Sequence, residues 1–291
     1  MVEPISEHEA HVHHVVEVMV EGTTSIQSYE IVRLGGHGRA LVIGGRVQST
    51  EADEAIYHEA LLLPAFTFAP AVTRVLCLGG ANGGILHRVL ALPGVTEVRQ
   101  FDLDAELHER TVEYLSYMHR DALNDPRALI GFGDPKGMLE DLEGPFDLIL
   151  ADLPDSVPGT HAPGMFTFEF YQRIRKLLGD AGMFATQAGP ANPLGPAFMA
   201  SVLRTAQEVF AHAHPFTSAV PAFGVPWGFV LASNHPFAPN SPGPRMVDVP
   251  DSVTTYDTET HHHMFAIPRL LRERLIATGR VITDDEPMVQ A

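Results

Sequence analysis

The chain has few cysteines, few basic residues and no long apolar run, and each shortage excludes a class of protein. The single cysteine, Cys77, cannot form an internal disulfide, which fits a reducing cytoplasm. The 19 Lys and Arg residues against 36 Asp and Glu give a formal charge of −17, which argues against nucleic-acid and anionic-membrane partners. No apolar run approaches the roughly 18 residues of a membrane span, and no signal-peptide pattern is seen. We therefore expect a cytoplasmic protein with no nucleic-acid or membrane partner, whose charge suits a cationic substrate.

Histidine, by contrast, is abundant, with 16 residues. His11, His13, His14 and the run 261–263 fall in polar segments that lack the carboxylate or cysteine partners of a recognisable metal site. We expect these histidines to lie at the surface and predict no metal. Cys77 falls within an apolar run, and we expect it to fill space in a buried strand.

The first part of the chain, residues 1–52, is predicted to be a β-rich domain. Apolar and polar residues alternate, with a glycine-rich turn at 35–38. This pattern predicts a small antiparallel sheet with strands at 14–20, 27–34, 40–43 and 46–48. A helix is expected from Asp53 to Leu63, leading to Pro64.

Residues 53–235 are predicted to form a second domain with a doubly wound parallel sheet. Apolar runs alternate with helical stretches at 105–117, 167–178 and 195–210, which is typical of α/β folds. Residues 236–291 form the third predicted part. Five prolines between Pro236 and Pro250 predict an extended connection, a helix is expected at 268–278, and the acidic stretch 284–286 is expected to be frayed.

A glycine-rich turn follows the apolar run Val75–Leu78, reading Gly79-Gly80-Ala81-Asn82-Gly83-Gly84. Such turns bring backbone close to a nucleotide-like ligand. Asp102 lies about 20 residues further on, where these folds place a carboxylate on ribose hydroxyls. A later apolar run, 146–151, ends in Asp152 and Asp155. Acidic residues at the carboxyl ends of parallel strands line the ligand crevice, so we expect an adenosine-type pocket with acid/base groups at its mouth.

These motifs, in this order, resemble the spermidine synthase family of polyamine aminopropyltransferases from Ser25 to about Leu275. Residues 41–59 resemble the family's L-D-G-x-x-Q-x-T-E-x-D-E-x-x-Y-H/Q-E signature. Residues 79–84 align with its G-G-G-D-G-G loop, and Asp152 to Asp155 with its D-x-x-D pair. The resemblance implies a small N-terminal β-domain followed by a Rossmann-like, class I methyltransferase-type core, in a homodimer or larger homo-oligomer.

The family moves a 3-aminopropyl group from decarboxylated S-adenosylmethionine to an amine such as putrescine. The resemblance implies that Asp152 is the base and that Asp155 holds the cationic amine. Tyr57 and His58 would reach in from the helix after the N-terminal sheet. No cofactor is expected to be bound permanently, because the nucleoside is the group donor.

On the donor side, the resemblance assigns Asp102 to the ribose hydroxyls, Asp134 to the adenine amino group and Gln27 to the nucleoside. Three glycines, Gly79, Gly80 and Gly83, would allow close backbone approach. Residues 156–159, with Pro158, stand where the family has a proline directly after its second aspartate, and Pro158 is expected on the donor side.

Two departures from the family pattern bear on the substrates. Asn82 replaces the loop aspartate, which is expected to hold the donor's ammonium and to repel the carboxylate of ordinary S-adenosylmethionine. Phe223 stands where a tyrosine hydroxyl usually meets the acceptor amine. The first change affects donor identity, and the second makes the acceptor pocket more apolar.

Three functions are therefore compatible with the sequence. The leading one is an aminopropyltransferase acting on putrescine or another amine. The second is an enzyme that uses intact S-adenosylmethionine for methyl transfer, aminocarboxypropyl transfer or cyclisation, which Asn82 would permit. The third is a non-catalytic nucleoside-binding relative, which the retention of both Asp152 and Asp155 disfavours.

Overall fold

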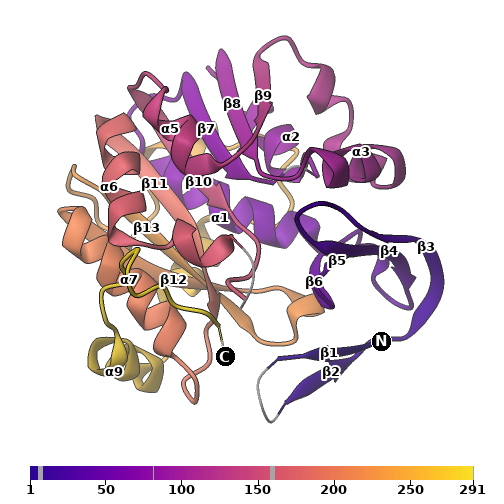
Figure 1. Ribbon diagram of the computed structural model, residues 1–291. Helices are drawn as coiled ribbons and strands as arrows, with labels where there is room; N and C mark the ends of the chain where they lie inside the picture. Colours follow the sequence, from indigo (N-terminus) through magenta and orange to yellow (C-terminus); the bar gives the residue numbers. More distant parts are fainter. Residues whose placement is uncertain (6–8, 81, 158–160, 291) are drawn as a thin grey trace.

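The computed structural model describes residues 1–5, 9–80, 82–157 and 161–290. Over these residues, a small antiparallel sheet lies beside a larger mixed sheet that is covered by helices on both faces (Figure 1). A short hairpin at the N-terminus, which the sequence did not predict, pairs β1 (Val2–Pro4) with β2 (Ala10–Val12). None of the helices in these ranges is both long and apolar enough to cross a membrane.

The small sheet confirms the predicted N-terminal β-region. Its strands run antiparallel in chain order: β3 (Val15–Thr23), β4 (Ser28–Leu34), β5 (Gly38–Ile43) and β6 (Arg46–Thr50). Successive side chains of a strand point to opposite faces, so each strand has two different environments. On β4, Ile31 packs against α3 (Ala105–Tyr114) and α4 (Ser116–His119), whereas Val32 joins the core of the large sheet. Strand β4, in the interior of the small sheet, therefore packs against other elements on both of its faces.

The large sheet has the predicted Rossmann-like form. Its strand order is β12-β13-β11-β10-β7-β8-β9, and the last five run parallel. The order of strands reverses between β7 and β10, and ligands bind in such sheets at this switch point. The bounds are β7 (Arg74–Gly79), β8 (Glu97–Asp102), β9 (Ala128–Phe132), β10 (Phe146–Asp152), β11 (Leu178–Pro190), β12 (His212–Ala219) and β13 (Pro226–Ser233).

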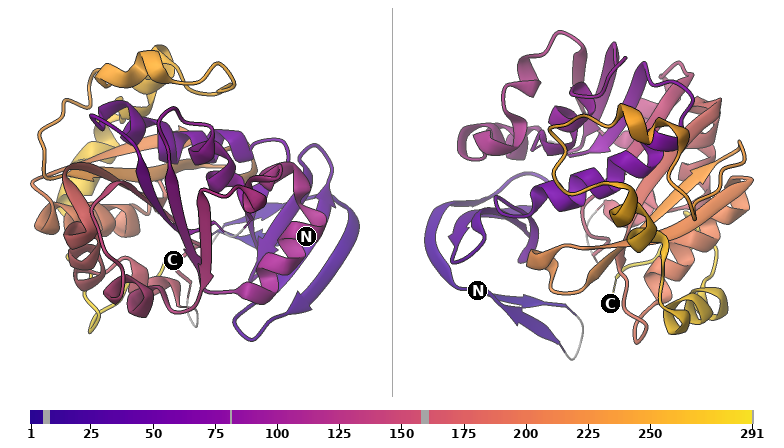
Figure 2. Two further views of the ribbon diagram at one scale, coloured as in Figure 1. Left: turned by 90° about the horizontal axis from the view of Figure 1, so that it is seen from above. Right: turned by 180° about the vertical axis from the view of Figure 1, so that it is seen from behind.

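Alternation along the strands divides the core into two layers. Val75 and Cys77 of β7 face one layer, and Leu76 and Leu78 face the other. The first layer is covered by α1 (Glu54–Phe68), α2 (Gly84–Leu90) and α8 (Thr258–Phe265). The second is covered by α5 (Pro135–Glu140), α6 (Phe168–Leu177), α7 (Ala197–Val209) and α9 (Arg269–Thr278). The two layers are visible from above and from behind in Figure 2.

Two predicted helices differ from the structure. The first, α1, does not end near Pro64 but continues to Phe68, because burial of almost the whole helix outweighs the hydrogen bond that proline removes. The predicted helix at 105–117 is two helices that meet at Leu115, which is buried beneath the small sheet. Helix α8 was not predicted.

The predicted extended connection and final helix are present, but the expectation of a frayed acidic tail was wrong. Ile282 is fully buried, and its backbone pairs with Phe168 and with the Thr205 hydroxyl. Asp284 accepts hydrogen bonds from Thr167 and Lys136. Tertiary contacts, which a local pattern does not reveal, therefore fix the tail.

The expectation of surface histidines was also wrong in part. His261 of α8 is buried, with its Nδ1 2.6 Å from the Tyr256 hydroxyl. The predicted domain boundaries at residues 52 and 235 stay predictions, because the first core layer takes side chains from all three parts of the chain.

Replacing Ile282 by alanine tests whether the tail is docked. We expect Ile282→Ala to lower the free energy of unfolding by about 2–4 kcal/mol, since it leaves a cavity in a closed core. Ile276→Ala is the matched control: Ile276 is 86% exposed, so its change should stay within about 0.5 kcal/mol. Urea unfolding of both variants gives the values, and similar small losses would contradict the docked tail.

Candidate functional site

A pocket lies where the carboxyl ends of β7, β8 and β10 face the small sheet and α1. It is partly open to solvent and has a wall that is more apolar than polar, as is usual for a small-molecule site. Most of the predicted site residues line it: Gln27, Tyr57, His58, Gly79, Gly80, Asn82, Asp102, Asp152, Asp155 and Phe223. The structure therefore brings these ten predicted residues together at one pocket, and the role of each stays a proposal.

The glycine loop and Asp152 are packed directly on each other. Gly79 has a φ of 81°, and a Cβ there would run into the backbone carbonyl of Asp152. At Gly80, with a φ of 72°, a Cβ would lie 2.6 Å from Asp152 Oδ2. The buried amide of Gln100 donates to both glycine carbonyls, at 3.0 and 2.6 Å. Glycine is thus required because the loop backbone must pass beside a carboxylate.

Two predicted donor-side residues that the structure describes, Gly83 and Asp134, are not found in the pocket wall. Gly83, which precedes α2, has a φ of 79°. A Cβ at this position would collide with His119, so the packing of His119 against the backbone requires glycine here. Asp134 caps α5, with its carboxylate accepting from the Lys136 N–H at 3.1 Å. Helix capping explains this aspartate without a ligand. Pro158 lies outside the described residues.

The remaining donor-side residues form a connected polar edge. Gln27 Nε2 donates to Asp104 at 3.0 Å, and the Asp104 N–H donates to Asp102 Oδ1 at 3.0 Å. Across the pocket, Asn82 Oδ1 accepts from the Gly84 N–H at 2.9 Å. An amide at this position is neutral, so it supplies no negative charge to the pocket.

A chain of charges runs from α2 to the pocket. Arg88 Nη1 lies 2.8 Å from Glu54, whose Oε2 lies 2.9 Å from His58 Nδ1. The other ring nitrogen of His58 lies 3.6 Å from Asp152 Oδ2. Glu54 and His58 are one turn apart on α1, so the helix fixes the ring between two carboxylates.

This arrangement sets the protonation of His58. Burial opposes the charged ring, but the two carboxylates, Asp152 at 3.6 Å and the hydrogen-bonded Glu54, outweigh it and raise the pKa of His58 to about 9. Burial also opposes the charge of Glu54, yet His58 and Arg88 lower its pKa to about 2. At neutral pH, His58 is therefore an imidazolium that holds the Asp152 carboxylate in place.

Tyr57 and Asp155 lie on the other side of Asp152. Burial raises the pKa of Tyr57 well above its ordinary value, and the nearby Asp152 carboxylate adds to this, so its hydroxyl stays protonated. Burial raises the pKa of Asp155 to about 6. Arg46, on β6, opposes that shift from 3.6 Å away. Asp152 and Asp155 therefore differ in their surroundings and in the cation that each one faces, which is His58 for Asp152 and Arg46 for Asp155.

The segment before and along α1 positions this side of the site. Asp53 accepts from the Thr50 hydroxyl at 2.6 Å and from the Ala222 N–H at 2.7 Å, which ties β6 to the loop carrying Phe223. A Cβ at Gly84 would collide with the His58 ring. The acidic and glycine residues of the motifs thus serve the geometry as well as the chemistry.

Sequence reasoning missed three residues in or beside the part of the pocket that contains Asp155 and Phe223. Trp227, the only tryptophan of the chain, packs against Phe223 with ring centroids 4.6 Å apart, and both line the pocket. Gln187, at the end of β11, lines it too and bonds the carbonyls of Leu153 and Pro154. Arg46 occupied a variable position of the signature. Two features of the sequence could have pointed to them: Trp227 is the single tryptophan, and Arg46 is a cation that lies between two pocket-lining segments.

His58→Gln should change how stability depends on pH. Because the pKa of His58 is about 9 in the folded protein and about 6.5 when unfolded, its charge stabilises the fold fully below pH 6.5. That stabilisation is lost as pH rises towards 9, and is on the order of 3 kcal/mol. We expect the unfolding free energy of the wild type to fall by this amount relative to His58→Gln between pH 6 and 9.5. The exposed His263→Gln should track the wild type; equal pH slopes in wild type and His58→Gln would contradict the buried imidazolium.

Comparison with known proteins agrees with this geometry. The chain is 34% identical over 286 residues to a polyamine aminopropyltransferase of Synechococcus sp. (strain JA-3-3Ab), covering 94% of this chain and 91% of that protein. It is 35% identical over 222 residues to thermospermine synthase ACAULIS5 of Arabidopsis thaliana, covering 76% of this chain and 65% of that protein.

The fold is also that of a known structure. A spermidine synthase crystallised with the transition-state analogue AdoDATO superposes with a TM-score of 0.87, at 23% identity, over 95% of this chain and 94% of that one. The family described as spermine/spermidine synthase domain matches residues 54–241, which span α1 and the whole large sheet. The resemblance read from the sequence is thus confirmed: the chain belongs to the spermine/spermidine synthase family of transferases.

Proposed function

We propose that the chain transfers a 3-aminopropyl group from decarboxylated S-adenosylmethionine to a primary amine and releases methylthioadenosine. The observation that carries this is the position of Asp152. Its carboxylate lies against Gly80 of the glycine loop on one side and 3.6 Å from the His58 ring on the other. It can therefore reach a nucleophile placed beside a donor bound at that loop.

The reaction needs alignment and removal of a proton. The amine lone pair attacks the carbon next to the sulfonium, the carbon–sulfur bond breaks, and its electron pair neutralises the sulfur. The nitrogen must lose a proton, since an amine with a pKa of ~10 enters mostly as the ammonium. Asp152 accepts that proton, and the fixed imidazolium of His58 keeps its carboxylate oriented. Tyr57 lines the pocket together with the same carboxylate.

On the donor side, the pocket supports a nucleoside. Asp102 and Gln27 lie on its polar edge, and Gly79 and Gly80 present backbone there. We keep Asp102 as the partner of the ribose hydroxyls. Asp134 and Gly83 are not in the pocket wall, so the proposal gives them no contact with the donor.

On the acceptor side, Asp155 is paired with Arg46, 3.6 Å away, and the wall beside it is formed by Phe223 and Trp227. A carboxylate that is already paired with a cation attracts an ammonium group less strongly. The surroundings support a primary amine next to Asp152, while the pairing argues against a second ammonium at Asp155. A homodimer or larger homo-oligomer and a cytoplasmic location belong to the same proposal and rest on family analogy.

A second function is favoured by one observation. Asn82 lines the pocket as a neutral amide where the family pattern has aspartate, so nothing there repels the carboxylate of intact S-adenosylmethionine. Transfer from the propyl side of that donor would also release methylthioadenosine, whereas methyl transfer would release S-adenosylhomocysteine. Product analysis with each donor separates the two functions.

Asp152→Asn should abolish most of the activity. We expect kcat to fall by at least about 10²-fold, because the variant keeps the shape of the side chain but cannot accept the proton. The measurement is release of methylthioadenosine from the decarboxylated donor with a panel of monoamines and diamines. Asp180→Asn, an exposed aspartate on β11, is the matched control and should keep wild-type rates. Unchanged turnover in Asp152→Asn, or no product with any amine in the wild type, would overturn the proposal.

Asn82→Asp should change which donor binds. A new carboxylate attracts the donor ammonium and repels the carboxylate of the intact donor, an effect of up to ~4 kcal/mol for a unit pair near 4 Å. We expect the affinity ratio of decarboxylated to intact donor to rise at least about tenfold, as measured by calorimetry at one pH and salt concentration. A ratio that does not move would mean that Asn82 lies too far from the donor's aminopropyl end to select it.

A further inference from the structure

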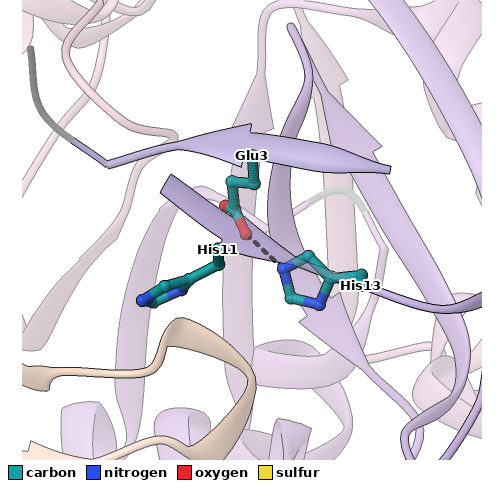
Figure 3. Close-up of side chains that lie close together, drawn as sticks. All are labelled: Glu3, His11 and His13. Carbon is teal, nitrogen blue, oxygen red and sulfur yellow. Dashed lines mark hydrogen bonds and ion pairs between the residues drawn. The ribbon is translucent and has the colours of Figure 1, made fainter. Parts of the chain in front are cut away.

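Three metal-ligating side chains meet on the N-terminal hairpin, outside the catalytic groups described above. Glu3 of β1 pairs directly opposite His11 of β2, and His13 follows two residues later, just beyond the end of that strand. Figure 3 shows the three side chains close together. One ligand atom from each lies within 4.8 Å of the other two. The sequence showed no recognisable metal-site pattern around these histidines, but the pairing of the strands brings Glu3 to them.

The cluster is held from several sides. Glu3 is only 4% exposed, and its Oε1 accepts the N–H of Val47 at 2.9 Å. Its Oε2 lies 2.6 Å from His13 Nε2. The His11 ring lies against Gly224, which has a φ of 70°, and a Cβ there would collide with the ring. Thus β6 orients the carboxylate, and the loop before β13 leaves room for the imidazole.

This set of donors matches the chemistry of a particular class of ion. Two imidazoles and one carboxylate are ligands that Zn²⁺ and similar first-row ions prefer, with a fourth position left for water. A backbone N–H on the ligating carboxylate is the kind of outer contact that orients such ligands. A buried carboxylate also needs a positive partner, which either a protonated His13 or a bound cation supplies.

We propose that Glu3, His11 and His13 form a binding site for a divalent transition ion, with Zn²⁺ as the best match. The ion takes the place of the proton shared by His13 and Glu3. It links β1 and β2 to each other, to β6 through Val47 and to the loop at Gly224. Val47 and the residues flanking that loop, Phe223 and Trp227, line the pocket. Ion binding therefore stiffens the acceptor wall without entering the reaction.

Calorimetric titration of Zn²⁺ into the chelator-treated full-length protein tests the site independently of any activity. We expect one ion per chain, and binding weakened at least about tenfold in Glu3→Gln, His11→Asn and His13→Gln. Glu3→Gln keeps an oxygen for the Val47 N–H, so the hairpin can still pack. His14→Gln is the matched control, because His14 is exposed and neighbours the site without belonging to it.

Absence of Zn²⁺ binding, or equal affinity in the wild type and all three variants, would overturn the proposal, since the other histidines would then account for any signal. A Co²⁺ spectrum of the wild type decides the matter even if a variant unfolds. Visible bands of a low-coordinate nitrogen and oxygen site are expected. A spectrum identical to that of aqueous Co²⁺ would count against the site.

Discussion

The buried contact of His58 with two carboxylates is the interaction on which the rest of the site depends. It joins α1, through Glu54, to the end of β10, through Asp152. The same ring fills the space beside Gly84, at the start of α2. A buried charge is tolerated only when it is paired, so these three elements must come together in one arrangement for the core to form. Orientation of the reactive carboxylate is therefore a consequence of folding.

Around this contact, the two halves of the pocket are built differently. The donor half is mostly backbone: glycines at positive φ, held by Gln100, pass beside Asp152. Side chains from separate elements form the acceptor half, with Arg46 from β6, Phe223 from the loop after β12 and Trp227 from β13. Backbone geometry changes little when single residues change, whereas a wall of side chains changes with each substitution. The part of the pocket formed by the glycine loop is thus more strongly constrained by the fold than the part formed by side chains.

Electrostatics within the pocket follow from the same construction. Asp152 has a cationic partner held by a second carboxylate, and Asp155 has Arg46. Although the protein carries a formal charge of −17, its two central carboxylates are each matched locally by a positive group. Net charge therefore describes the surface and the approach of a cationic substrate, but the strength of binding depends on these local pairs.

The sequence alone determined the fold class, the glycine turn and the two aspartates, because apolar periodicity and glycine at positive φ are local requirements. It did not reveal the docked tail at Ile282, the helical course through Pro64, or the capping role of Asp134, since burial and backbone competition decided those. Only the tertiary structure brought Arg46 to Asp155 and Glu3 to His13, over 109 and 10 positions of the chain (155 − 46 and 13 − 3). Contacts between side chains on different elements depend on how those elements pack, which no local pattern encodes.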